Sequence, residues 1–444
     1  MIEQGQNMAG TNIRTMGAET TIVVVASDLY EEAPIWYLRV KQAADRGARL
    51  IVANPRRTKL DRFASHAIRY EYGDEIKTVQ GLNKGKTAEA FSGEQNLLIL
   101  FGSEGLGVEG TANLASACAK LLQDTGHVGK PNNGLIGVWE RANDQGAWEM
   151  GFEVAGDLAD ALRGKSVYIV GADPVGDDPA LARALEEAQF VVVQDVIQTA
   201  TTGIADVVLP ARAFTEREGT LTSGERRVQR FYSAVPPTGE SRVDYDITAQ
   251  VASHMGIELE DASPTAVFER LASSVQSFEG LTYAKLSEVK PQWPIVGRGD
   301  IYYGGTTYEN KMGLGAHLAT ATALGENVDV PRVERQPAPR PRVKELLAVP
   351  VNKLYDRGTT VMMSADLLRD RIGSPMISLH PDAARNLGVE AGDLVQVSFD
   401  GVTGEARVKF DDTIEAGVML VPREMGFAIR EPIPAQVSVP AKVE

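Results

Sequence analysis

The chain has 444 residues, of which 43% are hydrophobic, and its 45 basic and 60 acidic side chains give a formal net charge of −15. This length is too great for one hydrophobic core and predicts two or three domains. The acidic balance argues against nucleic-acid binding and against docking on anionic lipid. No apolar run reaches the roughly 18 residues that would span a bilayer. Residues 1–19 lack the apolar stretch of a signal peptide, so we expect a cytoplasmic protein.

The sequence contains a single cysteine, Cys118, together with five histidines. Iron–sulfur clusters generally need four thiolate ligands or a mixture of Cys and His. We therefore expect no iron–sulfur cluster on this chain, and an intrachain disulfide is excluded. Cys118 lies in the pattern NLASACAKLLQ, which is typical of a helix. This position favours a small buried core residue over a reactive or metal-binding thiol.

The first part of the chain predicts a β-α-β unit with a right-handed crossover. Thr20–Ala26 is an apolar strand, a helix begins at Pro34 and stops near Gly47, and residues 48–53 form the next strand. Polar residues follow both strands. Asp28, Glu31 and Glu32 come after the first strand, and the run from Asn54 to Thr58, which includes Arg56, comes after the second.

A further buried strand is predicted at residues 96–101, followed by glycines and then by a helix over residues 111–125. Glycines before a helix can form a phosphate-binding loop. The spacing of Gly102, Gly105 and Gly107 is not that of the G-x-G-x-x-G motif, and Glu104 and Glu109 would repel phosphate. An ordinary tight turn between strand and helix is therefore favoured.

The middle of the chain repeats the alternation of strands and helices. Residues 166–170 predict a strand, residues 179–188 a helix, and Phe190–Val193 a buried parallel strand. Residues 205–209 form another apolar run, which Pro210 should stop because proline cannot donate to a ladder. Residues 244–255 predict an amphipathic helix. Open α/β sheets bind ligands just past the carboxyl ends of their strands, where the polar loops of this region begin.

The last part of the chain has a different residue pattern from the regions before it. Residues 331–342 are rich in proline and predict an extended linker. A β-rich region then begins at residues 359–364, and it includes a short helix over residues 381–389. Residues 392–398 predict a turn and an alternating strand, and residues 405–410 and 418–421 predict further strands.

The segment from Val191 to Arg230 contains the ordered string QD…T…ADVVLP…E…GT…RRVQ. This string closely resembles the molybdopterin oxidoreductase superfamily, which includes formate dehydrogenases and nitrate reductases. Residues 141–151 resemble that family's Asn-x-x-Gly-Ala-x-x-Met-Gly passage, and the turn beginning at Gly392 resembles its dinucleotide-binding barrel. The resemblance, from about Thr20 to the end, implies two doubly wound, formate dehydrogenase-like α/β domains followed by a C-terminal double-psi-type β-barrel. The expected domains are residues 1–138, 139–345 and 346–444.

The resemblance also implies which residues contact a cofactor. Working members of this family hold a bis-pterin molybdenum or tungsten centre, with molybdopterin guanine dinucleotide as the cofactor that this chain would bind. Carried over position by position, the contacts are Asp195 and Thr199, with Asp173 and Arg56 as further candidates. Asp195 can accept from the N–H edge of a guanine or pterin. The alternative is that these residues only cap neighbouring helices and loops, since Asp and Thr are good N-caps.

Departures from the family pattern argue against a retained cofactor. Asp28-Leu29 stands where the family has Asn-Pro, and Asn54 replaces an Asp. Glu31 and Glu32 place carboxylates where dinucleotide phosphates would lie, and like charges repel strongly in a partly desolvated cleft. The sequence indicates no metal ligand and no catalytic residue.

Three functions are consistent with these patterns. The Glu31–Pro34 loop and residues 301–311 resemble the large peripheral-arm subunit of NADH:quinone oxidoreductase, respiratory complex I. The first hypothesis is a structural subunit of such a complex, without a redox centre, held on the cytoplasmic side of the inner membrane by partner subunits that include a separate iron–sulfur chain. The alternative is the pterin-binding fragment of a split formate dehydrogenase-like molybdenum or tungsten oxidoreductase. The third is a free-standing module that binds another ligand, and fold alone does not separate the three.

Overall fold

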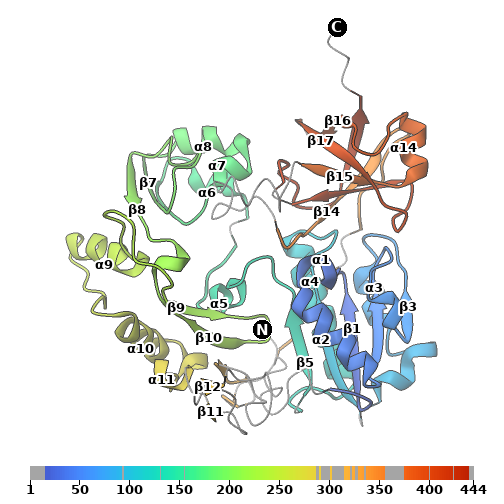
Figure 1. Ribbon diagram of the computed structural model, residues 1–444, viewed down its shortest axis with the longest axis horizontal. Coiled ribbons are helices and arrows are strands. Elements are labelled where there is room, and N and C mark those ends of the chain that lie inside the picture. The colour runs from blue at the N-terminus through green and yellow to red at the C-terminus, as the bar shows by residue number, and fades with distance from the viewer. Residues whose placement is uncertain are drawn as a thin grey trace.

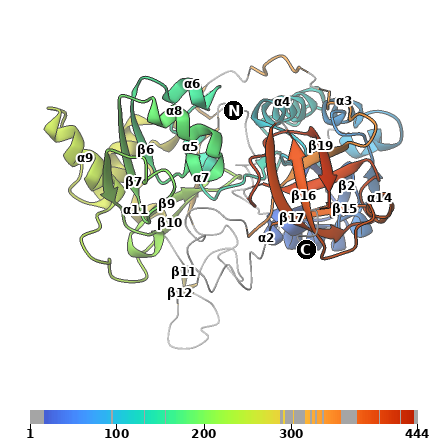
Figure 2. The ribbon, with the colours of Figure 1, turned by 90° about the horizontal axis from the view of Figure 1, so that it is seen from above.

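The computed structural model describes residues 16–92, 95–130, 132–154, 156–286, 290–291, 301–302, 315–320, 323–325, 329–334, 337–355, 375–399, 401–423 and 425–439. Figures 1 and 2 show a first α/β unit in blue and teal, a second unit in green and yellow, and a barrel in orange and red. In both views the barrel lies against the first unit on the right, and the second unit lies on the left.

The first unit is built on a five-stranded parallel sheet in the order β3-β2-β1-β4-β5. The strands are β1 (Thr20–Val25), β2 (Arg49–Ala53), β3 (His66–Ile68), β4 (Asn96–Phe101) and β5 (Gly134–Gly137). The chain moves outward from β1 to β3 and then returns to place β4 on the other side of β1. The strand order therefore reverses between β1 and β4, and such a switch point is where open α/β sheets form a ligand crevice.

Helices cover both faces of the first sheet. The helices of this unit are α1 (Leu29–Glu32), α2 (Pro34–Asp45), α3 (Glu75–Gly81) and α4 (Val108–Asp124), with the 3₁₀ turns η3 (Asp61–Phe63) and η4 (Gly85–Phe91). One buried cluster joins Val23 and Ile51 to α4, and the other joins Val24 and Leu50 to α2. Burial on both faces explains why the strands are continuously apolar. Cys118 is fully buried in α4, as predicted.

The second unit contains a three-stranded parallel sheet of β6 (Ser166–Val170), β7 (Phe190–Asp195) and β8 (Val207–Pro210). Its helical elements are α5 (Asp144–Glu149), α6 (Leu158–Leu162), α7 (Pro174–Asp177), η5 (Pro179–Leu181), α8 (Ala182–Glu186), η6 (Phe214–Glu216), α9 (Asp244–His254), α10 (Pro264–Ser274), η7 (Gln276–Phe278) and α11 (Tyr283–Leu286). The helix expected over residues 179–188 is thus a 3₁₀ turn followed by a short helix. Pro210, expected to stop a strand, is the last residue of β8, which lies at the edge of the sheet.

This second sheet is less enclosed than the first. Val191 and Val193 of the central strand β7 are buried, whereas Tyr168 and Val170 on the edge strand β6 are 39% and 48% exposed. An antiparallel sheet of β9 (Gly219–Thr222), β10 (Arg227–Phe231) and β13 (Ala316–His317) completes the unit, and β11 (Lys290–Pro291) pairs with β12 (Ile301–Tyr302). Residues 303–311, the remainder of the complex I-like patch, lie outside the described residues.

The C-terminal region closes into a six-stranded barrel in the order β14-β18-β15-β17-β16-β19. These strands are β14 (Leu346–Val351), β15 (Met376–Leu379), β16 (Leu394–Phe399), β17 (Val402–Phe410), β18 (Val418–Pro422) and β19 (Ile433–Ser438). Helix α14 (Pro381–Leu387) is capped at its C-terminus by Gly388, whose φ of 69° is the left-handed conformation that glycine adopts readily. The α/β class and the closing barrel confirm the predicted fold. Residues 359–364 lie outside the described residues.

Residues 337–342 of the proline-rich segment pack against the first unit. Residues 337–342 form no helix or strand. A Cβ atom added at Gly73 would lie 2.3 Å from the backbone nitrogen of Ala338, so only glycine permits this approach.

Domain boundaries at residues 138 and 345 stay predictions. No helix in the described parts of the chain has the length and apolar character that a bilayer-spanning segment requires.

Candidate functional site

The carboxyl edge of the first sheet gathers one arginine and two carboxylates from three strand ends. Arg56 follows β2, Asp28 follows β1 and Glu104 follows β4. The Arg56 guanidinium donates from Nε to Glu104 Oε1 at 2.9 Å and from its second terminal nitrogen to Oε2 at 2.8 Å. Its other terminal nitrogen donates to Asp28 Oδ2 at 3.0 Å. Arg56, a predicted cofactor contact, is therefore engaged by side chains of this chain.

This cluster is buried and has further hydrogen bonds. Asp28, Arg56 and Glu104 are 6%, 8% and 1% exposed. The Tyr72 hydroxyl donates to Glu104 Oε1 at 3.0 Å, and the Asn54 side-chain nitrogen donates to the same atom at 3.3 Å. Burial alone would lower the pKa of Arg56, but the two carboxylates outweigh burial and raise that pKa. The guanidinium is therefore a permanent cation inside the cluster.

Glu32 adds a third carboxyl group at this edge. Its Oε1 accepts from the backbone N–H of Asp28 at 2.8 Å, and its Oε2 accepts from the Ser27 hydroxyl at 3.1 Å. Burial, followed by repulsion from Glu104, raises the pKa of Glu32 to about 8. Glu32 is therefore mostly protonated at neutral pH, because burial disfavours the charged carboxylate.

The glycine-containing loop after β4 is a tight turn, as predicted, in which the backbone N–H of Leu106 donates to Ser103 O at 2.9 Å. The backbone N–H of Glu104 donates to Ala26 O, and the N–H of Gly105 donates to Pro350 O on β14, both at 3.0 Å. The carbonyls of Ser103 and Leu106 accept from Arg423 of the barrel. The loop therefore holds the barrel, and its N–H groups at Glu104 and Gly105 are already bonded.

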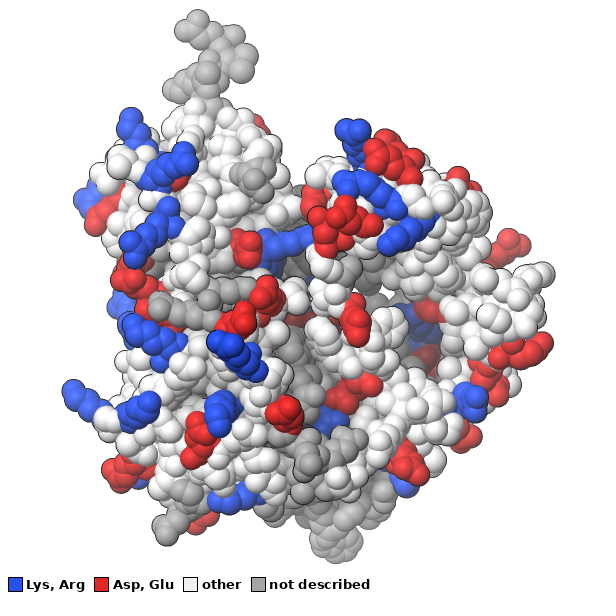
Figure 3. Space-filling model, turned by 180° about the vertical axis from the view of Figure 1, so that it is seen from behind, with Lys and Arg blue, Asp and Glu red and all other residues white. Residues whose placement is uncertain are grey.

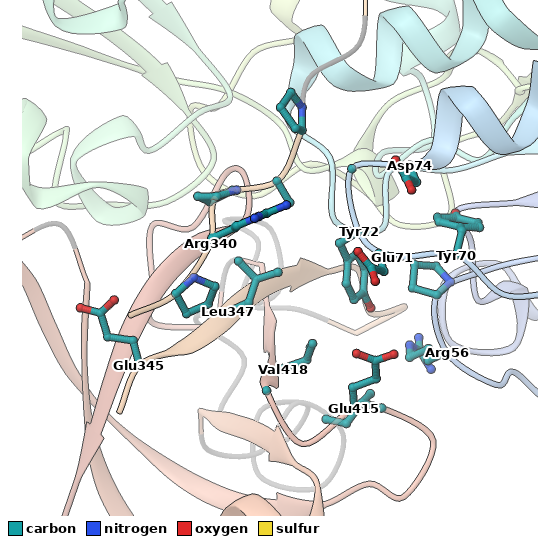
Figure 4. A pocket seen from close by; sticks show the side chains of 18 of the residues that line it. Arg56, Tyr70, Glu71, Tyr72, Asp74, Arg340, Glu345, Leu347, Glu415 and Val418 are labelled. Carbon is teal, nitrogen blue, oxygen red and sulfur yellow. The ribbon is translucent and has the colours of Figure 1, made fainter. Parts of the chain in front are cut away.

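A cavity of about 460 Å³ lies beside this cluster, between the first unit, the proline-rich segment and the barrel. Figure 4 shows Arg340 and Leu347 on one side of the cavity and Tyr72 and Arg56 on the other. The Arg56 guanidinium lies at the edge of this space but is paired with Asp28 and Glu104. The lining mixes both signs of charge and gives no concentrated anion site.

The carboxyl edge of the second sheet brings together the predicted residues Asp173, Asp195 and Thr199. Asp173, after β6, is the N-cap of α7: its Oδ1 accepts from the backbone N–H of Gly176 at 3.2 Å. The same oxygen accepts from the backbone N–H and the hydroxyl of Thr201, at 2.9 and 2.6 Å. The Thr201 hydroxyl in turn accepts from the N–H of Val175 at 3.1 Å. These bonds agree with the capping alternative for Asp173, and they fix the loop after β7 against the loop after β6.

Asp195 ends β7 and has one buried carboxylate oxygen that no donor in hydrogen-bond geometry meets. Its Oδ1 accepts from the backbone N–H of Val196 at 2.6 Å. Its Oδ2 is buried, since the residue is only 5% exposed, and no donor meets hydrogen-bond geometry there, although the backbone N–H of Ile197 is near enough to the carboxylate to lower its pKa. Burial raises the pKa of Asp195, and the nearby Asp173 raises it further. A buried acceptor without a donor is costly unless a ligand supplies one.

Thr199 lies on the loop beyond Asp195 and forms a small reciprocal turn. Its backbone N–H donates to the Thr202 hydroxyl at 2.7 Å, and its own hydroxyl oxygen accepts from the N–H of Thr202 at 3.2 Å. Because the Thr199 oxygen acts as an acceptor in this bond, its hydroxyl hydrogen can still donate to a ligand.

The later charged residues of the Val191–Arg230 segment form internal ion pairs. Arg226 makes a two-point pair with Glu149, at 2.7 and 2.9 Å, and Arg230 donates to Glu218 at 3.0 Å. Sequence reasoning missed Thr201 as the partner of Asp173 and Glu104 as the partner of Arg56. The second pair joins residues 48 positions apart, and no local pattern signals such a contact.

Neither edge gathers the ligands of a metal ion. Within the described ranges, no group of three or more His, Cys, Asp or Glu side chains is arranged to hold one. Burial raises the pKa of the Cys118 thiol, which lies in the core of the first unit. On the face shown in Figure 3, basic and acidic side chains are interspersed and form no continuous basic stripe.

Two models of known families match this chain. The sequence profile described as molybdopterin oxidoreductase matches residues 2–254, which is more than half of the chain. The chain belongs to the molybdopterin oxidoreductase family. A second profile, described as the molydopterin dinucleotide binding domain, matches residues 349–438 and so covers most of the barrel.

Relatives of this molybdopterin oxidoreductase chain include subunits of several enzymes. It is 26% identical to the F420-dependent formate dehydrogenase subunit alpha of Methanocaldococcus jannaschii, covering 94% of this chain and 74% of the relative. It is 26% identical to the NADPH-Fe(3+) oxidoreductase subunit alpha of Geobacter sulfurreducens, covering 93% of this chain but 54% of the relative. It is 30% identical to formate dehydrogenase H of Escherichia coli over 46% of this chain and 33% of that protein. The chain thus spans only about half of the Geobacter protein and a third of the Escherichia coli protein.

A solved structure supports the fold across nearly the whole chain. Acetylene hydratase from Pelobacter acetylenicus superposes with a TM-score of 0.63 at 14% identity, covering 98% of this chain and 80% of that one. The predicted superfamily is confirmed by the family model that matches residues 2–254. The relatives named here favour the formate dehydrogenase-like alternative over the complex I-like first hypothesis.

Proposed function

We propose that this chain is the dinucleotide-holding part of a formate dehydrogenase-like molybdenum or tungsten oxidoreductase, and that it binds molybdopterin guanine dinucleotide at the carboxyl edge of the second sheet. The observation that carries the proposal is the unpartnered Oδ2 of Asp195, at the end of the central strand β7. Membership of the family and the match to a dinucleotide-binding domain supply the chemical class of the ligand.

The residues at this edge fit a guanine or pterin ring. Such a ring presents an N–H edge, and Asp195 Oδ2 is an acceptor without a donor. The Thr199 hydroxyl can donate to a phosphate or to a ring acceptor. Asp173 and Thr201 act as positioning residues, because their bonds hold the loops after β6 and β7 together. When bound, the dinucleotide carries the molybdenum or tungsten ion at which the redox chemistry takes place.

The test is the nucleotide content of the purified full chain. Acid hydrolysis of a bound molybdopterin guanine dinucleotide releases GMP, which is quantified per chain, and elemental analysis measures molybdenum and tungsten. We expect GMP in the wild type and at least a tenfold loss in Asp195→Ala. The control Asp261→Ala changes an exposed carboxylate of the same unit and should keep the wild-type content. A wild-type chain that carries neither GMP nor metal would contradict the proposal.

A second candidate function is the structural subunit of a complex I-like NADH:quinone oxidoreductase, attached to the membrane through partner subunits. The closed cluster around Arg56 favours it, because a strand-end edge occupied by its own side chains serves packing better than ligand binding. The two candidates differ in one result. Only a scaffold would co-purify in stoichiometric amounts with an iron–sulfur chain and contain no GMP, no molybdenum and no tungsten.

A further inference from the structure

We infer that the two carboxyl edges of this chain have divided roles: the second sheet alone holds a dinucleotide, and the first sheet's edge is closed to one and joins the first unit to the barrel. The inference rests on the proposed function for its statement about the second sheet. The statement about the first sheet rests on the contacts of Asp28, Arg56 and Glu104 and of the barrel residues that cover them.

Charge is the first reason why the edge of the first sheet is closed to a dinucleotide. At the switch point between β1 and β4, the single guanidinium of Arg56 already faces two carboxylates, Asp28 and Glu104. A dinucleotide phosphate entering here would meet a cluster with an excess of negative charge. Recruiting Arg56 to that phosphate would leave two buried carboxylates without their cation, which is strongly unfavourable.

Backbone donors are the second reason. N–H groups at helix N-termini and glycine loops bind phosphate when they are free. Here the N–H of Tyr30 donates to Asp28 Oδ1 at 3.3 Å, and the N–H of Asp28 donates to Glu32 Oε1 at 2.8 Å. In the loop after β4, the N–H groups of Glu104 and Gly105 donate to backbone carbonyls. Each of these four donors is therefore bonded within the chain.

The barrel is the third reason. The backbone N–H of Leu354 donates to Glu31 O at 2.7 Å, and Lys353 pairs with the Glu31 carboxylate at 2.8 Å. Asn352 donates to the Ser103 hydroxyl at 2.9 Å. These contacts place the segment after β14 directly on α1 and on the loop after β4, and Figure 1 shows the barrel seated at this end of the first sheet. The barrel therefore covers the part of the crevice over α1 and the loop after β4, while a cavity beside Arg56 and a hollow beside Asp28 remain.

The basic residues near this edge are also paired. In the open hollow beside it, Arg57 pairs with Asp412 at 3.5 Å, and Lys59 lies 3.1 Å from the centre of the Tyr30 ring. Two acceptors at the first edge, Asn54 Oδ1 and Asn352 Oδ1, lack a partner. Asn54 is 0% exposed and its amide nitrogen donates to Glu104, whereas Asn352 is half-buried and its amide nitrogen donates to Ser103. Asp195 of the second sheet lies beside Val196, which is 41% exposed. Unlike Asn54 Oδ1, the unpartnered acceptor of the second sheet is thus adjacent to exposed surface.

The decisive measurement is the number of GMP molecules released per full-length chain. One GMP supports the inference. Two would overturn it while leaving the proposed function in place, and none would overturn the proposed function and the assignment to the second sheet with it.

Variants then locate the nucleotide. Asp195→Ala should reduce the released GMP from one to less than about 0.1 per chain, the tenfold loss expected above. The double variant Arg57→Gln/Lys59→Gln, which removes two cations beside the first edge, should retain one. The opposite pattern, with GMP retained in Asp195→Ala and lost in the double variant, would place the nucleotide on the first sheet and overturn the inference. Circular dichroism of each variant confirms that a loss of GMP does not reflect unfolding.

Discussion

Arg56 and Glu104 form a two-point ion pair, with both oxygens of the carboxylate hydrogen-bonded to the guanidinium at 2.9 and 2.8 Å. Both side chains are less than a tenth exposed. The pair spans the central part of the first sheet from the end of β2 to the end of β4, and Asp28 at the end of β1 completes it. Such planar pairs add geometric specificity as well as energy.

Removing the cation of this cluster should destabilise the protein strongly. In Arg56→Met, Glu104 and Asp28 would stay buried without a cation, and breaking a buried pair in this way costs about 3–5 kcal/mol. Arg57→Met is the matched control, because Arg57 is exposed and an exposed pair contributes about 0–1 kcal/mol. Denaturant unfolding followed by fluorescence measures both. Equal midpoints for the two variants would show that the buried pair contributes no more than the exposed one.

Glu32 should make stability fall as pH rises. Its folded pKa of about 8 lies above the ordinary glutamate value of 4.5, so the folded state binds a proton that the unfolded state loses. That stabilisation is complete below about pH 4.5 and is lost as pH rises to 8. Asp28 and Glu104 face Glu32 from the first unit, and Arg423 faces it from the barrel.

Glu32→Gln mimics the protonated side chain and does not titrate. The difference in melting temperature between Glu32→Gln and wild type should therefore shift in favour of the variant between pH 5 and pH 8.5. We expect a shift of several degrees, because wild type loses about 1–2 kcal/mol of stability over this range and the variant does not. Thermal scans at four pH values measure the difference. A constant difference across this range would show that Glu32 does not titrate there.

The sequence predicts those parts of the fold that depend on residues close together in the chain. The runs at β1, β2, β4 and β7 are apolar because they are buried, and their patterns predict strands. The strands β3 and β5 have only three and four residues, and β5 contains two glycines, so their place in the sheet depends on neighbouring strands. The barrel is predictable through its resemblance to a family.

The candidate site is less completely predictable, for a physical reason. From the sequence, Glu31, Glu32 and Glu104 are charges that repel phosphate. In the structure Arg56 pairs with Glu104, and burial raises the pKa of Glu32 to about 8. Both facts depend on contacts between distant residues and on burial, which a pattern of residue types does not record. The same holds for Thr201, whose hydroxyl bonds to a residue 28 positions earlier.

Gly176 should be essential to the loop at the second sheet. A Cβ atom there would lie 1.9 Å from Asp173 Oδ2, so Gly176→Ala must displace the capping carboxylate. Loss of a cap together with strain should cost about 2–3 kcal/mol. Gly81→Ala is the control, because a Cβ atom at Gly81 meets nothing within 4 Å and alanine favours a helix. Urea unfolding should show a lower midpoint for the first variant and an unchanged or higher midpoint for the second.

Asp195 should lower the stability of the ligand-free chain and contribute to nucleotide binding. Because its pKa is raised by burial, the folded state loses stability as pH rises through that pKa. Asp195→Asn keeps an acceptor for the N–H of Val196 but removes the buried charge, so the ligand-free variant should be more stable than ligand-free wild type by about 1 kcal/mol near pH 8. The gain should be no larger at pH 5, where more of the wild-type carboxylate is protonated.

The ligand reverses this order in our proposal. A donor from a guanine or pterin satisfies Asp195 Oδ2 in the wild type, whereas the side-chain amide of the Asp195→Asn variant would present N–H donors on one side and weaken that contact. Melting scans of chains with and without bound nucleotide measure both effects on the same samples. If the ligand-free Asp195→Asn variant melts below ligand-free wild type at pH 8, Oδ2 already has a partner in solution and does not await a ligand donor.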